Sequence, residues 1–265
     1  MNLFLRELKS HRKSVLIWSF VLAIFMYLSM AKFSALSTDA TASQQLMQAL
    51  PTTMQAIFGM VGLDLTTITG YYGICFIFIA VMLAVHAGML GAELIAKEEV
   101  DKTAEFLYVK PISRARALAI KLAAGLLILA VLFAVTWLST YSSIAMVNSG
   151  NVPVKELGIF SQALAIMQLL FFALGVLCAA GLRQPKRAAT IIAGVVLVAY
   201  IAYVLQGLSS DFSWAKALSP FAYFSAKDIL AKSGIDTTYA YMCIMASLTA
   251  LSASYLAYTR RDFKI

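Results

Sequence analysis

The stretch YYGICFIFIAVMLAVHAGMLGA, residues Tyr71–Ala92, determines the fold class of this chain. It contains no Asp, Glu, Lys or Arg, and it is longer than the roughly 18 apolar residues that indicate a bilayer span. Lipid offers backbone groups no hydrogen-bond partner, so a run of this length must be helical. The alternating pattern of a membrane β-barrel is absent. The stretch therefore predicts a transmembrane helix.

Five further runs of the same kind lie outward from this one, at Val15–Ala31, about Leu118–Met146, Ile159–Leu182, Ala188–Leu208 and Tyr239–Tyr258. Hydrophobic residues make up 61% of the chain and charged residues only 13%, against roughly a quarter charged in a soluble domain. A soluble domain of this size could not bury so much apolar surface. We predict an all-α polytopic membrane protein with six transmembrane helices in a single domain, residues 1–265.

The basic residues predict the orientation of the spans. All but five of the 21 Lys and Arg residues lie near the two chain ends, between the second and third runs, or between the fourth and fifth runs. The five exceptions are Lys32, Lys155, Lys216, Lys227 and Lys232. Positive charge is retained on the cytoplasmic side, so we expect both termini in the cytoplasm. The net charge of +8 then reflects topology and contact with anionic lipid rather than nucleic-acid binding.

Two segments outside the runs are expected to contact the membrane surface. As a helix, residues 1–13 would place Phe4, Leu5 and Leu8 on one side and the basic residues mostly elsewhere. This fits either a short amphipathic helix in the inner interface or an ordinary basic flank. Residues 209–238 are rich in aromatic side chains, which favour the headgroup level, so we expect one or two short helices in the outer interface. A cleavage site at Ala40–Ala42 lies too far beyond the first run for a signal peptide, and Lys32 intervenes.

The connection between the second and third runs, about residues 93–117, has a different composition. As a helix it would place apolar residues on one face and charged residues on the other, followed by Pro111 as a stop and Ser113 as the cap of the next helix. The apolar positions are Val100, Ala104, Leu107 and Tyr108, and the charged ones are Glu98, Asp101, Lys102 and Glu105. The pattern fits a docking helix for a soluble partner, or a solvated loop that follows the charge rule.

The same segment carries a family resemblance. GAELIAKEEVDKTAEFLYVKPISR, residues Gly91–Arg114, followed by Lys121, resembles the permease subunits of ABC-2 type transporters, whose pattern there is G-x-x-x-I-A-x-E-E-x-x-G-T-x-E-x-L-L-x-x-P-x-S-R. Lys102 stands where the family has Gly. Weaker similarity occurs at Leu50-Pro51, Phe58-Gly59, Gly70-Tyr71 and Leu218–Phe224.

The resemblance implies a type V exporter-like permease in which residues 93–117 form the coupling helix that contacts an ATP-binding subunit. The contact residues it implies are Glu98, Glu99, Asp101, Thr103, Glu105, Leu107, Pro111 and Arg114. The chain has no G-x-x-x-x-G-K-[ST] phosphate loop, so it is not expected to be an enzyme or to bind a cofactor. ATP and Mg²⁺ are expected on the partner, in an assembly with a second permease subunit, identical or different.

Inside the runs, two polar residues form a candidate site. His86 is the one histidine within a run, and Glu93 follows two helical turns later on the same face. Ionisable residues in membranes are candidates for proton or substrate roles. However, Glu93 belongs near the inner boundary, and a neutral histidine bonded to a neighbouring helix is the simpler explanation of His86. Cys75, Cys178 and Cys243 lack metal-ligand spacing. The small-residue pairs Ala84/Gly88, Ala87/Gly91 and Gly175/Ala179 fit either internal packing or a subunit interface.

We therefore expect an ATP-driven exporter in the plasma membrane of a bacterium, with a hydrophobic or amphipathic cargo such as a drug, a peptide antibiotic or a lipid. An intramembrane protease is disfavoured, because Thr103 stands where the prenyl-peptidase pattern needs Arg and both histidines lie upstream. Two alternatives stay open: an ion-coupled secondary carrier, and a membrane subunit for peptide sensing or immunity that does not transport.

Overall fold

The computed structural model describes residues 3–37, 49–100, 113–182 and 184–260. These residues form helices joined by turns, with no strand among them. Six of their helices are long and apolar enough to cross a membrane, which confirms the predicted all-α, multi-pass fold. They are α1 (Leu3–Ser37), α4 (Ile68–Val100), α6 (Arg114–Val147), α7 (Val154–Gly181), α8 (Ala188–Leu208) and α11 (Thr237–Arg260).

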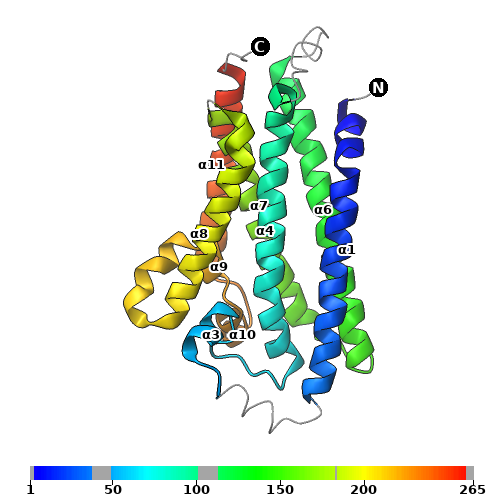
Figure 1. Ribbon diagram of the computed structural model, residues 1–265, viewed down its shortest axis with the longest axis vertical. Helices are drawn as coiled ribbons and strands as arrows, with labels where there is room; N and C mark the ends of the chain where they lie inside the picture. Colours follow the sequence, from blue (N-terminus) through cyan, green and yellow to red (C-terminus); the bar gives the residue numbers. More distant parts are fainter. Residues whose placement is uncertain (1–2, 38–48, 101–112, 183, 261–265) are drawn as a thin grey trace.

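The six long helices stand side by side in a bundle (Figure 1). The start of α1, the end of α4, the start of α6 and the end of α11 lie at one end of the bundle, which we call the termini side. α4 is central and packs against α1, α6, α7 and α8. Most residues in the apolar parts of α4 and α7 are buried, whereas fewer than a third are buried in those of α1, α8 and α11. The described residues on either side of residues 101–112 therefore lie at the same end of the bundle as the first and last described residues.

The first helix differs from one of the two interpretations of its sequence. α1 runs without interruption from Leu3 to Ser37, so residues 3–13 do not form a separate helix that turns before the first span. Both the local sequence and contacts with another helix explain why α1 is continuous. No Gly or Pro breaks this stretch, and its first turns are held by contacts such as that of Leu3 with Ala117 of α6.

The centre of the bundle is a close crossing of α4 and α7. A Cβ atom on Gly91 of α4 would lie 2.4 Å from the carbonyl oxygen of Phe172 in α7, and one on Gly175 of α7 would lie 2.0 Å from the carbonyl oxygen of Gly88 in α4. No larger residue fits between backbones at such distances, so the glycines allow the two helices to touch. These small residues therefore serve internal packing, one of the two roles that their spacing allowed.

Short helices complete the side opposite the termini. They are α3 (Thr52–Ile57), η2 (Ser210–Leu218), α9 (Pro220–Tyr223) and α10 (Ala226–Lys232), while η1 (Pro185–Arg187) precedes α8 on the termini side. Serine hydroxyls cap the starts of η2, α9 and α10 by accepting backbone N–H groups. Ser113 caps α6 in the same way, as predicted, by accepting the N–H of Arg116 at 3.3 Å.

Candidate functional site

A buried ion-pair cluster joins α1 to α4 near the termini side. The carboxylate of Glu7 in α1 is fully buried, and its Oε2 lies 3.7 Å from Nζ of Lys97 in α4. Arg6 Nη2 lies 3.1 Å from Oε1 of the same carboxylate, and Lys97 also donates to the hydroxyl of Ser10. A buried carboxylate requires such partners, since removing it from water is costly. The cluster therefore fixes the last turns of α4 against α1.

Two further polar contacts lie next to this cluster, one between α1 and α4 and one between α6 and α4. Nδ1 of His11 in α1 lies 3.9 Å from Oε2 of Glu93 in α4. The ammonium of Lys121 in α6 is fully buried and donates to the carbonyl oxygen of Leu94. Because these contacts all fall between residues 93 and 97 of α4, they hold the part of α4 that leads toward the predicted coupling segment.

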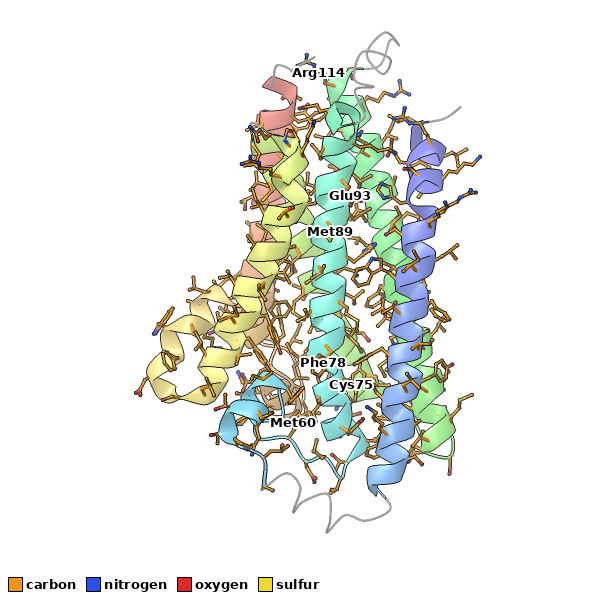
Figure 2. All side chains as sticks on the ribbon, in the orientation of Figure 1. Met60, Cys75, Phe78, Met89, Glu93 and Arg114 are labelled. Carbon is orange, nitrogen blue, oxygen red and sulfur yellow. The ribbon has the colours of Figure 1, made fainter. Side chains whose placement is uncertain are left out.

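The residues predicted to contact an ATP-binding subunit are only partly described. Glu98 and Glu99 lie in the last turn of α4, and Arg114 is the first residue of α6. Arg114 Nη1 donates to the carbonyl oxygen of Thr259 in α11 at 3.5 Å, and Figure 2 shows Arg114 at the termini side, beyond Glu93. The structure thus brings the ends of α4, α6 and α11 together. Asp101, Thr103, Glu105, Leu107 and Pro111 lie outside the described residues.

His86 and Glu93 do not contact each other. They are two turns apart, about 10 Å along α4, and each meets a different residue of α1. The ring of His86 is buried and packs edge-on against Trp18, with ring centroids 5.4 Å apart. Its Nδ1 has no hydrogen-bond partner among the described residues. The candidate polar site is thus two separate polar positions facing α1.

Sequence reasoning missed Glu7. The segment before the first span was interpreted from its basic residues, and the one acidic residue among them received no role. The positive-inside rule concerns Lys and Arg and does not account for a lone acidic residue within a basic flank. The presence of Glu7 there was the available signal. The partner Lys97 could not be identified in the same way, because it lies far away in the sequence.

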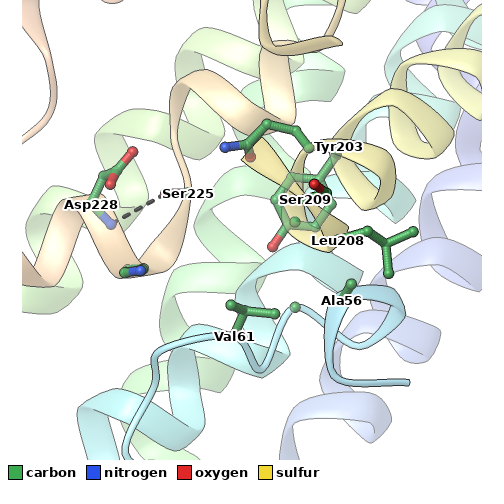
Figure 3. Close-up of a pocket in the computed structure, with 11 residues that line it drawn as sticks. Ala56, Val61, Tyr203, Leu208, Ser209, Ser225 and Asp228 are labelled. Atoms are coloured by element: carbon green, nitrogen blue, oxygen red, sulfur yellow. Dashed lines mark hydrogen bonds between the residues drawn. The ribbon is translucent and has the colours of Figure 1, made fainter. Parts of the chain in front are cut away.

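A pocket of about 340 Å³ lies at the opposite end of the bundle (Figure 3). It is formed by the end of α8 with Tyr203 and Leu208, the turn after α3 with Val61, and the start of α10 with Ser225 and Lys227. Its wall combines apolar side chains with hydroxyls, the ammonium group of Lys227 and the carboxylate of Asp228.

The six long apolar helices and the charged cluster at one end define a multi-pass helical membrane protein. The sequence model of the ABC-2 family transporter protein matches residues 1–263, so the chain belongs to the ABC-2 family of transporter proteins. This confirms the resemblance found in residues 91–114. No curated protein matches the chain.

Proposed function

We propose that this chain is the membrane-spanning permease subunit of an ATP-driven exporter, and that a separate ATP-binding subunit docks on its termini side and binds the ATP and Mg²⁺. The observation that carries the proposal is the meeting of three helix ends there. Glu98 and Glu99 close α4, Arg114 opens α6, and Arg114 bonds to Thr259 near the end of α11. A subunit docked at residues 93–117 would contact helices from three parts of the chain at once.

The packing of α4 explains how docking could act on the membrane region. The Glu7–Lys97 pair and the Lys121–Leu94 bond fix the end of α4 to α1 and α6. Farther along, α4 touches α7 backbone to backbone. A movement imposed on the end of α4 is therefore transmitted to its neighbours, because closely packed helices shift as rigid bodies rather than deforming.

The remaining features of the proposal follow from charge and from the family. The predominance of Lys and Arg at the chain ends and before α6 supports a cytoplasmic location for the termini side. In this proposal the chain resides in a bacterial plasma membrane, pairs with a second permease subunit, and moves a hydrophobic or amphipathic cargo outward.

The test is an affinity purification of the chain from its native membrane in mild detergent, followed by identification of the co-purifying chains and measurement of ATPase activity. We expect a soluble ATP-binding protein in equal amount, with ATP hydrolysis in the complex. Recovery of the chain alone, without ATPase activity, would contradict the proposal. That outcome would direct attention to His86 and Glu93 as parts of an ion-coupled carrier.

A further inference from the structure

The pocket between α3, α8 and α10 lies at the depth of one membrane surface. It is bounded by Tyr203 and Leu208, in the last turns of an apolar helix that is long enough to cross a bilayer. The hydrocarbon core ends where such a helix ends, and the phosphate groups of lipids begin there. Any molecule in this pocket is therefore at headgroup level.

The pocket contains a cation whose position the backbone determines. Gly62 has φ +75°, and a Cβ atom on it would lie 2.8 Å from Cδ and 2.9 Å from Cε of Lys227. Only glycine adopts this conformation without strain and leaves that space. The side chain of Lys227, including the ammonium group 3.2 Å from that Cβ position, thus lies along the backbone of Gly62 at the edge of the pocket that Lys227 lines.

Among the described residues, Lys227 has no acidic partner. The adjacent Asp228 has one, because its Oδ2 lies 3.6 Å from Nζ of Lys216. Lys232, later on the same helix, pairs with Asp236 at 3.0 Å. Asp228 also lines the pocket, but its carboxylate is paired with Lys216. Lys227 therefore leaves this group of three charges with a net positive charge, which one anionic group would balance.

Hydrogen-bond donors and apolar surface lie next to this cation. Ser225 and Tyr203 contribute hydroxyl groups to the pocket wall (Figure 3). Outside the pocket, α3 and η2 expose large apolar side chains, among them Met54, Ile57 and Trp214. A ligand that suits both parts has one anionic oxygen group and attached apolar chains.

We propose that this pocket binds the phosphodiester group of a membrane phospholipid, with the phosphate oxygens accepting hydrogen bonds from Lys227 and the nearby hydroxyls while the acyl chains pass along α3 and η2. The site is independent of ATP-binding subunits, because it lies at the end of the bundle opposite Glu98 and Arg114. Its lipid could be a fixed structural component or a molecule in transit.

The test uses the full-length protein purified in detergent, with native mass spectrometry to measure binding of phosphatidylglycerol. Lys227→Ala is compared with Lys232→Ala, which removes the same charge from the same short helix but from outside the pocket lining. We expect Lys227→Ala to weaken lipid binding about 5- to 30-fold, as for loss of one charge-assisted hydrogen bond. Lys232→Ala should bind as the unmodified protein does, and Lys227→Arg should retain most of the affinity.

Two controls identify the ligand. Diacylglycerol, which lacks the phosphate, should not bind at this site, and inorganic phosphate should not displace phosphatidylglycerol at equal concentration. Equal binding by the Lys227→Ala and Lys232→Ala proteins would overturn the proposal and assign the lipid to non-specific contact. Displacement by inorganic phosphate alone would assign the pocket to a free anion and overturn the lipid as its occupant.

Discussion

Gly175 of α7 lies directly against the backbone of Gly88 in α4: a Cβ atom on Gly175 would stand 2.0 Å from the carbonyl oxygen of Gly88. Van der Waals contact between carbon and oxygen needs well over 3 Å, so no side chain fits there without moving a helix. The two most buried helices are thus assembled through their backbones. This crossing connects the end of α4 at the termini side with the interior of the bundle.

Replacing Gly175 by alanine should destabilise the bundle. The methyl group would overlap the α4 backbone, and overpacking of this kind costs about 1–3 kcal/mol or more. The measurement is the thermal unfolding midpoint of the purified protein in detergent. Gly158→Ala is the matched control, because Gly158 is on the same helix and a Cβ there meets nothing within 4 Å. Equal midpoints for the two variants would contradict the close crossing.

Loss of Lys97 should loosen α1 from α4. Lys97→Met leaves the buried Glu7 carboxylate with Arg6 as its remaining close cation. We expect a loss of about 1–3 kcal/mol, below the cost of stripping a buried carboxylate of all its partners, since Lys97 is partly exposed and Arg6 is retained. The free energies of unfolding of Lys97→Met, Glu7→Gln and the Glu7→Gln/Lys97→Met double variant give the coupling energy of the pair. Lys9→Met is the control, because Lys9 is an exposed lysine of α1. Strict additivity of the two single effects would show that the pair contributes nothing.

Reversing the charge of Glu98 and Glu99 should release the proposed ATP-binding subunit. The Glu98→Lys/Glu99→Lys variant places two cations at the end of α4, where the proposed partner meets two carboxylates. We expect normal membrane insertion and at least about a tenfold loss of co-purified ATPase, as for loss of close charge pairs at an interface. Glu98→Asp/Glu99→Asp preserves both charges and should retain most of the binding. Unchanged ATPase binding and transport in the reversed variant would remove these residues from the contact.

The turn before α4 should lose stability in acid. Asp64 Oδ1 accepts hydrogen bonds from the N–H of Thr66 at 2.9 Å and from its hydroxyl at 2.7 Å. These bonds hold the pKa of Asp64 below its ordinary value. A lowered folded-state pKa adds stability above the unfolded pKa of about 3.9, and this contribution disappears as the pH falls through the folded value.

The difference in unfolding midpoint between the unmodified protein and Asp64→Ala should therefore be present near pH ~6 and shrink toward pH ~3. The effect is small, because Asp64 is exposed. Thr66→Val keeps the hydrogen bond from the backbone N–H and removes the one from the hydroxyl, so the pKa of Asp64 should be lowered less. The unfolding midpoint of this variant should therefore change less with pH than that of the unmodified protein. A difference that is constant over this pH range would exclude the hydrogen-bonded carboxylate as its source.

The hydropathy of the sequence predicted where the apolar spans lie but not where the helices begin and end. The apolar run Tyr71–Ala92 predicted the second span, but α4 extends from Ile68 to Val100. The extension contains Glu93 and Lys97, which end an apolar run but do not end a helix, because α1 supplies partners for both side chains: His11 for Glu93 and Glu7 for Lys97. Lys121 is similar: it was counted as a cytoplasmic charge, yet it is fully buried against Leu94. Charged residues thus indicate where an apolar span ends, but they do not indicate where the helix or the packed bundle ends.

The sequence by itself determined the helical class, the number of apolar spans and the membership in the ABC-2 family. Each of these depends on local information, since a backbone in lipid satisfies its hydrogen bonds within one helix and a motif is contiguous. The tertiary structure alone decided that Gly88 meets Gly175, that Glu7 is buried beside Lys97, and that Lys227 lies along Gly62 at a pocket. These contacts join residues from separate helices or loops, so only the packing of the whole bundle brings them together.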